Sequence, residues 1–404
     1  MKSLILLLLV TVLCGCASHP SLPLLPMEGA PPDSVVAVSL DRAISMASVL
    51  HLYPWAIREW PANLDLIGDL QPSLVGRAAL VWGWEHLMLR SLGGLQARVA
   101  ALHERAPDAV VQGCIFEFIS RDIERVTVPA HVLAAFGLTP DPRPYDFDAM
   151  LAPGAPDDFP GWGMDAAVPD LTRQETQLWF FHLATLYLDA GLEAIHLGNL
   201  ERMAARDPDL RITEGLLRRI RDHAVRHARR GWVLLDAHTH GVVLSGRLLL
   251  DFHSFPLRPR EVGDAADENV VLEAGFQDAI YGRSRGGVTP SGIAVAHQRF
   301  LVELDNGYAG PTPGGCDLPE CVWGSDEITW FARQPTERRD ALLAYFWRRV
   351  PELDPRGRFQ MPGVRPLQAQ LVTGCDRYLA HDPSVLACGG GQAATIAALW
   401  LEAR

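Results

Sequence analysis

Acidic and histidine side chains recur at the ends of short apolar runs in this 404-residue chain. Asp236 and His238 follow the run WVLL, and Asp251 and His253 follow the run RLLL. Two carboxylates can cleave a glycosidic bond, one as acid and the other as nucleophile or base. Imidazoles that alternate along a strand point to the same side and can hold one zinc ion. The spacing therefore suggests a sugar-cleaving site or a metal site.

Short apolar runs alternate with amphipathic helical stretches along most of the chain. Strands are predicted at 77–84, 110–120, 192–199, 232–240, 247–255, 300–306, within 322–332 and at 357–363. Helices are predicted at 91–106, 175–191, 214–231, 335–350 and 391–404. Residues 33–60 are assigned to no element, and 121–172 form a long excursion rich in Pro, Asp and Gly.

This alternation implies a parallel sheet with helices packed on it. About eight strands at this length predict an α/β fold of the (β/α)8 TIM-barrel type, with the helices outside. The alternative is an open doubly wound sheet. No strand is followed by the glycine-rich phosphate loops that such sheets often carry, which disfavours it. We expect one barrel domain over residues 35–404, with N-terminal and C-terminal extensions.

The carboxyl ends of parallel barrel strands meet at one rim, where active sites are built. Unpaired buried charges are costly, so a set of acids and imidazoles at these ends indicates a site rather than a stabilising core. The same rim is predicted to receive further polar side chains: Glu117, His196, Glu303 and Asp305.

Over about residues 75–365 the pattern resembles exported bacterial (β/α)8-barrel glycoside hydrolase-like lipoproteins. In several such hydrolase families the nucleophile ends strand four and the acid/base ends strand six. Carried onto the predicted strands, the resemblance implies catalytic roles for Asp236 and Asp305, with Glu303 as a substitute. No glycosidase signature string is present, and the Asn-Glu pair common on strand four is absent. The expected activity is glycoside hydrolysis on a carbohydrate substrate, without a cofactor.

Other side chains near this rim are expected to bind the substrate rather than react with it. Imidazoles and acids would hydrogen-bond sugar hydroxyls, and indole rings would stack on sugar faces. The predicted substrate-binding set is Glu117, His196, His238, Asp251, His253, Trp82, Trp323, Asp326 and Glu327. Further indoles that could stack on sugars are Trp84, Trp162 and Trp330.

Two alternatives stay open. The string Asp236-Ala-His238-Thr-His240 resembles the D-x-H-x-H metal motif of amidohydrolase-like and polymerase-and-histidinol-phosphatase-like barrels, which implies a metal-dependent hydrolase. Those families carry the motif on their first strand, whereas here it follows several others. Lys2 is the only lysine, so no carbamylated lysine can bridge two metals. The second alternative is a non-catalytic glycan-binding lipoprotein.

Two further sequence strings resemble functional motifs but are predicted to be a loop and a solvated helix face. Gly282-Arg-Ser284-Arg-Gly286 matches the G-x-S-x-G nucleophile elbow, but that elbow must lead into a helix. Here Gly287 and a proline follow, so a loop is predicted. The basic run at 218–230 is predicted to be a solvated helix face.

The N-terminal segment has the layout of a bacterial export signal. One lysine precedes an apolar run of about ten residues, too short to span a bilayer. Leu13-Cys14-Gly15-Cys16 resembles a lipobox, which implies a signal peptide over 1–16 and lipidation at Cys16. Residues 17–34 are predicted to be a Pro-rich tether. We expect an exported, membrane-anchored lipoprotein in the periplasm or at the cell surface.

Charge and cysteine usage narrow the class further. The net charge of −12 gives no basic footprint for a nucleic-acid partner. In an exported protein, Cys316 with Cys321 and Cys375 with Cys388 can form disulfides. Cys114 lies within an apolar strand and is predicted to be a buried thiol.

Overall fold

The computed structural model describes residues 24–154, 165–262, 269–272, 285–306, 326–367, 376–381 and 390–402. Their main feature is a ring of eight parallel strands that follow one another in chain order. The strands are β1 (Ala43–Met46), β2 (Leu74–Val81), β3 (Val110–Ile115), β8 (Ala194–His196), β9 (Leu234–Asp236), β12 (His253–Pro256), β17 (Phe300–Glu303) and β18 (Gly357–Pro366).

Two further contacts complete the ring. β18 pairs in parallel with β1, with Ile44 opposite Met361. Between β9 and β12, the amide of Ser254 donates to the carbonyl of Ala237 at 3.0 Å, and His238 and Ser254 form a parallel bridge. The predicted (β/α)8 barrel is therefore confirmed, and the alternative of an open sheet is wrong.

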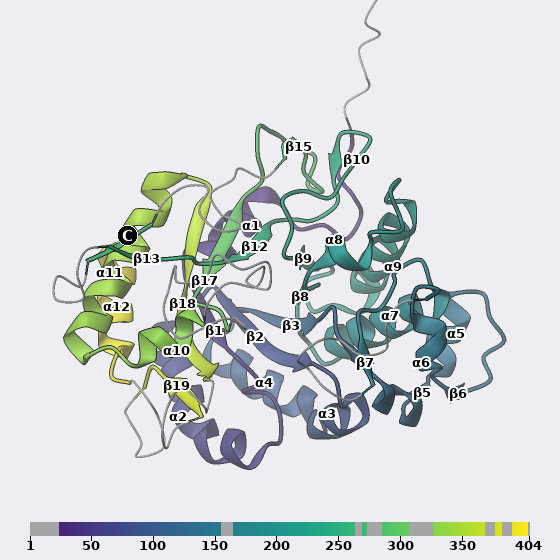
Figure 1. Cartoon of the computed structure of the whole chain (residues 1–404), viewed down its shortest axis with the longest axis horizontal. Coiled ribbons are helices and arrows are strands. Elements are labelled where there is room, and N and C mark those ends of the chain that lie inside the picture. Colours follow the sequence, from purple (N-terminus) through teal and green to yellow (C-terminus); the bar gives the residue numbers. More distant parts are fainter. Residues whose placement is uncertain are drawn as a thin grey trace, which may run out of the picture.

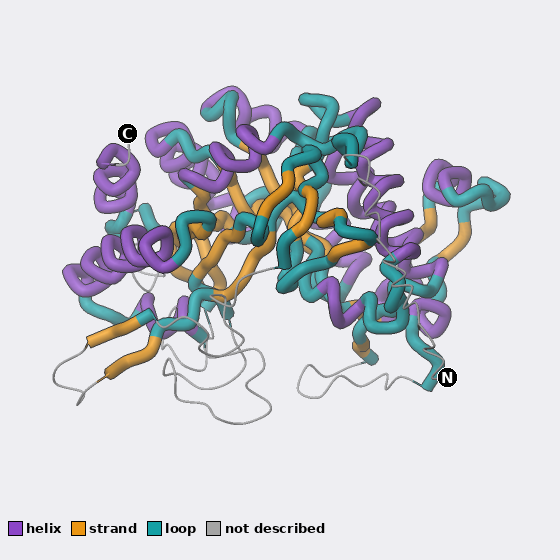
Figure 2. The backbone as a smooth tube through the Cα atoms, turned by 90° about the horizontal axis from the view of Figure 1, so that it is seen from above, coloured by secondary structure: helices purple, strands orange, loops and turns teal. Residues whose placement is uncertain are grey.

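Helices cover the outside of this ring, as Figures 1 and 2 show. The helices are α1 (Asp33–Asp41), α2 (Pro54–Leu70), α3 (Glu85–Ser91), α4 (Leu95–Arg105), α7 (Gln174–Asp189), α8 (Leu200–Met203), α9 (Arg211–His227), α10 (Glu327–Ala332), α11 (Thr336–Leu353) and α12 (Ala393–Glu402). The predicted helices at 91–106, 175–191, 214–231, 335–350 and 391–404 correspond to α4, α7, α9, α11 and α12. None of the described helices is long and apolar enough to cross a membrane.

The excursion after β3 folds into short elements at one side of the barrel. They are β4 (Ile119–Ser120), η1 (Arg121–Arg125), β5 (Thr127–Val128), α5 (Ala130–Ala135), β6 (Arg143–Pro144), α6 (Phe147–Met150) and β7 (Ala166–Ala167). Small extra strands decorate the later half: β10 (Val243–Leu244), β11 (Arg247–Leu248), β13 (Arg260–Val262), β14 (Asn269–Val271), β15 (Gly287–Val288), β16 (Ala294–Val295) and β19 (Arg377–Leu379).

The core lies between the ring and its helices. α7 shows why: most of its side chains are buried, and the hydroxyl of Tyr187 donates to the carbonyl of Cys114 at 3.1 Å. Cys114 itself is a buried free thiol, as predicted. The predicted disulfide partners Cys316, Cys321, Cys375 and Cys388 lie outside the described residues, as do the signal segment 1–16 and Cys16.

Three strand predictions need correction. The first barrel strand, β1, lies within the unassigned segment 33–60, because a four-residue strand is too short to show a period. The strand expected within 322–332 is the helix α10 among the described residues. The run 247–255 was predicted as one strand, but it divides into β11 and β12. Because β1 precedes all of the predicted strands, Asp236 ends strand five rather than strand four, and Glu303 ends strand seven rather than strand six.

Candidate functional site

A cavity of about 790 Å³ opens at the rim where the barrel strands end. One part of its wall is aromatic and is formed by Trp82, Trp84, Phe116, Phe118 and Phe255. The rest is polar and is formed mainly by Arg77, Glu117, Asn199, Glu201, His238, His240, Arg258, Asp305, Asn306 and Arg365. A cavity of this size with mixed walls fits a small molecule or a few sugar units.

The aromatic wall is held by ring contacts. Trp82 stacks on Phe118 with ring centroids 5.6 Å apart and meets Phe116 edge-on at 4.8 Å. Trp84 stands at 51% exposure with a φ of 42°, a left-handed conformation that a bulky residue rarely adopts. Such local strain concentrates at functional sites, so an exposed, strained indole indicates a surface for a flat apolar face.

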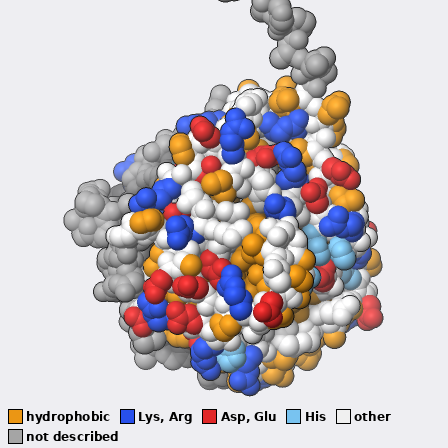
Figure 3. Space-filling view, turned by 90° about the vertical axis from the view of Figure 1, so that its right-hand side faces the viewer, with side chains coloured by type: hydrophobic (Ala, Val, Ile, Leu, Met, Phe, Trp, Pro, Cys, Tyr) orange, Lys and Arg blue, Asp and Glu red, His pale blue; other side chains and the backbone are white. Residues whose placement is uncertain are grey.

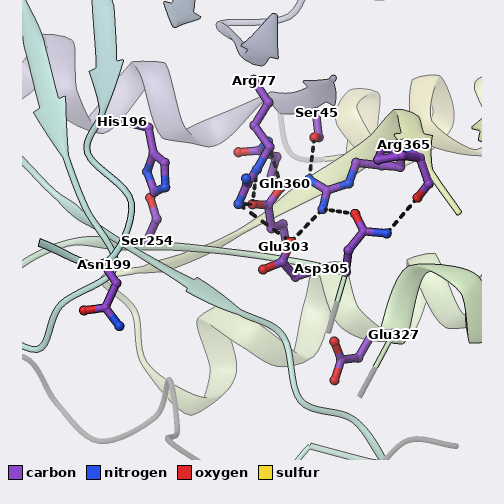
Figure 4. Close-up of polar contacts among 12 residues, drawn as sticks. Ser45, Arg77, His196, Asn199, Ser254, Glu303, Asp305, Glu327, Gln360 and Arg365 are labelled. Carbon is purple, nitrogen blue, oxygen red and sulfur yellow. Dashed lines mark hydrogen bonds and ion pairs between the residues drawn. The ribbon is translucent and has the colours of Figure 1, made fainter. Parts of the chain in front are cut away.

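Two buried arginines connect Glu303 and Asp305 at the bottom of the cavity (Figure 4). Arg365 donates to Glu303 Oε2 and to Asp305 Oδ1, both at 2.7 Å. Arg77 donates to Glu303 Oε1 at 2.5 Å and lies 3.8 Å from Asp305 Oδ1. Burial alone would raise the pKa of Asp305, but the charges of Arg77 and Arg365 outweigh it and hold the pKa well below its usual range. Asp305 is therefore an ionised carboxylate facing the cavity.

Glu117 lines the cavity from the other side. Its Oε2 accepts the backbone amide of Asn199 at 2.8 Å, and the side chain is almost completely buried. Glu201, in the short helix α8, also lines the cavity and accepts the hydroxyl of Thr239. Glu117 was predicted from its place after a strand, whereas Glu201 was missed because it follows the strand end by several residues.

Asp236 lies below the cavity instead of lining it. It is fully buried, and its oxygens accept from Gln112 at 2.8 Å, from His196 Nδ1 at 2.7 Å and from the hydroxyl of Ser254. Figure 4 shows His196 and Ser254 apart from the arginine cluster. These contacts satisfy the carboxylate within the barrel core, so it positions the neighbouring side chains.

The three side chains of the predicted metal motif are not brought together. His238 and His240 line the cavity, while Asp236 is occupied below it. Within the described ranges, one group of histidine and aspartate side chains has ligand atoms that all lie within 4.8 Å of one another. That group contains none of these three residues. The described structure therefore does not bring Asp236, His238 and His240 together as ligands of one ion, because β9 ends at Asp236 and the two histidines follow in irregular chain.

His238 is a neutral side chain in the cavity. Burial lowers the pKa of His238 well below its usual range, and the charge of His196 adds to this effect. The two rings meet edge-on with centroids 4.8 Å apart. In the part of the chain that the structure describes, His238 Nε2 has no hydrogen-bond partner, so it can serve a hydroxyl in the cavity. His253 is buried outside the cavity, and burial lowers its pKa to about 3.

Three predicted substrate-binding acids have structural roles. Asp251 pairs with the buried Arg221 at 2.9 Å. Glu327 accepts two hydrogen bonds from Arg258, each at 2.8 Å. Asp326 caps the N-terminus of α10. None of the three lines the cavity, although Arg258 does, and Glu327 is the group that holds that guanidinium.

Among the predicted side chains, Glu117, His238, His240, Asp305, Trp82 and Trp84 line the cavity. Asp236, His196, Glu303, Asp251, His253, Asp326 and Glu327 do not, and Trp330 is buried with its indole N–H donating to Glu261 at 3.0 Å. Trp162 and Trp323 lie outside the described residues. Sequence reasoning missed Arg77, Arg258 and Arg365. Each is in or next to a barrel strand, so the rim argument would have found them had it been extended to arginine.

No family model matches the chain, and no curated protein matches it. Several solved structures have a similar fold. The maltogenic α-amylase AmyB from Thermotoga neapolitana aligns over 90% of this chain and 77% of its own, with 10% identity and a TM-score of 0.44. A variant of the glycoside hydrolase domain of PelA from Pseudomonas aeruginosa aligns over 52% and 68%, with 15% identity and a TM-score of 0.30.

The α-galactosidase TtGalA from Thermus thermophilus aligns over 52% of this chain and 39% of its own, with 14% identity and a TM-score of 0.32. The chain thus spans well under half the length of that enzyme. These proteins share with this chain the barrel architecture, and at such values the likeness supports no conclusion about substrate or mechanism. The chain is a (β/α)8-barrel protein with a large, partly aromatic cavity at its C-terminal rim.

Proposed function

We propose that the chain is a carbohydrate-active hydrolase that cleaves a glycosidic bond in the rim cavity. The supporting observation is a pair of carboxylates, Asp305 and Glu117, that line one cavity with an aromatic wall. They follow β17 and β3, and three strands separate these two in either direction around the ring. The two acids therefore approach the cavity from opposite sides, as a sugar ring between them requires.

The environment of Asp305 suits one of the two catalytic roles, and Glu117 takes the other. Asp305 is held ionised by Arg77 and Arg365, which contact its Oδ1, so it acts as the nucleophile or as the group that stabilises positive charge on the anomeric carbon. Glu117 donates a proton to the leaving glycosidic oxygen and then takes one from the water that completes hydrolysis. Glu303 and Asp236, the other predicted catalytic acids, position the arginines and His196.

The polar wall supplies groups for sugar hydroxyls. His238 Nε2 and the side chain of Asn306, whose amide donates to the carbonyl of Pro366, lie at this wall. Trp84 and Trp82 supply flat surfaces on which sugar rings stack. The charges of Arg77, Arg365 and Arg258 are matched by those of Glu303, Asp305 and Glu327, so the wall carries no excess cation and favours neutral sugars.

The decisive test is glycan hydrolysis by wild type, Asp305→Asn and Glu117→Gln. Wild type is incubated with neutral oligosaccharides and polysaccharides, and new reducing ends are measured. Each variant should lose about 10²–10⁴-fold in rate, the usual contribution of a positioned acid or base. Asp209→Asn, an exposed acid far from the rim strands in sequence, is the matched control and should keep full activity.

Binding measurements separate this proposal from its main rival. If glycans bind to wild type and to both variants but are never cleaved, the chain is a non-catalytic glycan-binding protein and the hydrolase proposal fails. The aromatic wall supports that second candidate by itself, since stacking on Trp82 and Trp84 needs no acid pair.

We also propose that the chain is exported and anchored to a membrane through a lipid on Cys16. The lipobox-like string at 13–16 and the Pro-rich tether support this location. Wild type expressed in a bacterial host should partition into the detergent phase, and Cys16→Ser should move it to the aqueous phase. Equal partitioning of the two would contradict the anchor.

A further inference from the structure

A cluster of two histidines and one aspartate lies far from the rim cavity. Asp189 is the last residue of α7, and His223 and His227 are in the last turns of α9. These two helices pack side by side on the barrel (Figure 1). Each helix ends shortly before the strand that follows it, β8 or β9, begins. The cluster therefore lies at the amino ends of the barrel strands, opposite the proposed active site.

The geometry of the cluster matches that of a chelating site. His223 and His227 are four residues apart on one helix, the spacing that places two imidazoles on the same face for one metal. Asp189 Oδ1 is 2.7 Å from His223 Nε2 and 3.7 Å from His227 Nδ1. All three ligand atoms lie within 4.8 Å of one another. Zinc bonds of about 2.0–2.1 Å in a tetrahedral site set ligand atoms roughly 3.3 Å apart, which is within the range of the present spacings once the side chains turn toward the ion.

The helix ends add an electrostatic reason for a cation here. The C-terminus of a helix carries a partial negative charge, which opposes a carboxylate and favours a cation. α7 has no basic residue in its last turn, and yet Asp189 is located there. α9 ends at the same place, with His227 and Arg226 in its last turn. Two helix ends and one carboxylate thus face a pair of imidazoles, and Arg226 offsets only part of this negative potential.

The two imidazole rings lie face to face, and they must turn so that a nitrogen of each points at one ion. His223 and His227 stack with centroids 4.1 Å apart and planes 7° from parallel. His223 is mostly buried, whereas about half of the side chains of His227 and Asp189 is exposed. The face of the molecule shown in Figure 3 has histidine side chains next to acidic ones. An ion from solvent can therefore reach the cluster without any opening of the fold.

We propose that Asp189, His223 and His227 bind one divalent transition metal ion, with zinc preferred. Two imidazoles and a carboxylate are ligands typical of zinc, and water completes the coordination. The ion joins the end of α7 to the end of α9 and so clamps two neighbouring helices of the barrel. The site is separate from the carbohydrate cavity, and it stands whether or not the hydrolase proposal holds.

The test is a zinc titration of tag-free protein, freed of metal by a chelator and dialysed. Isothermal titration calorimetry should show about one zinc per chain, and the thermal unfolding midpoint should rise with zinc and then level off. His227→Ala and Asp189→Asn change exposed side chains and should fold normally. Each should weaken zinc binding at least tenfold and remove the rise in the unfolding midpoint.

Matched controls make the result specific. His131→Ala removes an exposed histidine from α5, and Asp222→Asn removes the acid next to His223 on α9. Both should bind zinc like wild type. Cobalt(II) should give a visible absorption band with wild type that is lost in His227→Ala. Absence of zinc binding by wild type, or binding that survives both His227→Ala and Asp189→Asn, would overturn the proposal.

Discussion

Glu117 depends on a single glycine for its place in the cavity. Gly198 has a φ of 47°, which glycine adopts at little cost. A Cβ at this position would overlap Oε2 of Glu117, which also accepts the amide of the next residue, Asn199. The end of β8 therefore fits against Glu117 only because residue 198 has no side chain.

Gly198→Ala should reduce glycan hydrolysis strongly while the protein stays folded. The new methyl pushes the carboxylate of Glu117 away from its amide partner, and the left-handed backbone itself costs about 1–2 kcal/mol for a residue with a Cβ. We expect a fall in kcat of at least tenfold and a modest loss in the free energy of unfolding, measured by hydrolysis kinetics and urea denaturation.

Gly137→Ala is the matched control for this change. Gly137 has a φ of 70°, but a Cβ there would meet nothing within 4 Å. Gly137→Ala should therefore lose free energy of unfolding through its left-handed backbone and keep full hydrolytic activity. Equal activity in Gly198→Ala and Gly137→Ala would remove Glu117 from the catalytic pair.

At the scale of elements, α10 shows how a cap can decide between helix and strand. The segment EITWFA contains β-branched and aromatic residues, which favour a strand. Asp326 precedes it, and its carboxylate accepts the amide and the hydroxyl of Thr329, each at 2.9 Å. This N-cap satisfies free amides of the first turn and favours a helix. Burial raises the pKa of Asp326 to about 6, because its hydrogen bonds only partly offset the lost hydration.

Asp326→Asn and Asp326→Ala should separate the cap from the charge. A raised carboxyl pKa contributes stability that is fully present below the unfolded value of about 3.9 and is lost as pH rises through about 6. Asparagine keeps an acceptor without the charge, so its free energy of unfolding should depend less on pH between 4 and 7. Alanine loses the cap and should cost about 1 kcal/mol at both ends of this range. Urea denaturation at pH 4.5 and pH 7.5 measures both effects, and identical pH dependence in wild type and Asp326→Asn would contradict the assignment.

The long apolar runs explain which elements the sequence could predict. β2, β3 and β17 lie within runs that are buried on both faces, and α7 and α9 are long and each followed by a glycine, Gly191 or Gly231. β1 has only four residues and no distinct pattern, so the strand count began one too late. That single miss moved Asp236 from strand five to strand four and made it look like a nucleophile. The strand positions of Arg77 and Arg365 could have placed them at the rim, but their shared contacts with Glu303 and Asp305 could not be predicted, because these side chains meet only when β18 closes the ring onto β1.

Over the whole molecule, buried histidines link stability to pH. Burial lowers the pKa of His51 and His253 to about 3 and of His182 to about 4. The unfolded chain protonates these imidazoles below about pH 6.5, whereas the folded chain stays neutral. The unfolded state then binds more protons, so their contribution to stability is present above pH 6.5 and is lost as pH falls. Glu85 acts in the opposite sense, since burial raises its pKa to about 7.

His51 offers the clearest test, because its partners define its neutral form. The amide of Leu80 donates to Nε2 at 3.1 Å, so this nitrogen carries no proton, and Nδ1 lies 2.7 Å from the hydroxyl of Ser91. That hydroxyl donates to the carbonyl of Met88, which leaves Nδ1–H as the donor to Ser91. Protonation of Nε2 would break the bond from Leu80 and place a charge in the core between β2 and its helices.

His51→Gln should make the protein less sensitive to acid. The amide oxygen of glutamine can accept from Leu80 but does not titrate. Between pH 6.5 and pH 4.5, wild type should lose roughly 2–3 kcal/mol more of its free energy of unfolding than the variant does, since each pH unit is worth about 1.4 kcal/mol for one such group. Urea denaturation at several pH values gives both slopes. Parallel slopes for wild type and His51→Gln would mean that His51 takes up its proton as readily in the folded barrel as in the unfolded chain, and the neutral tautomer deduced from Leu80 and Ser91 would be wrong.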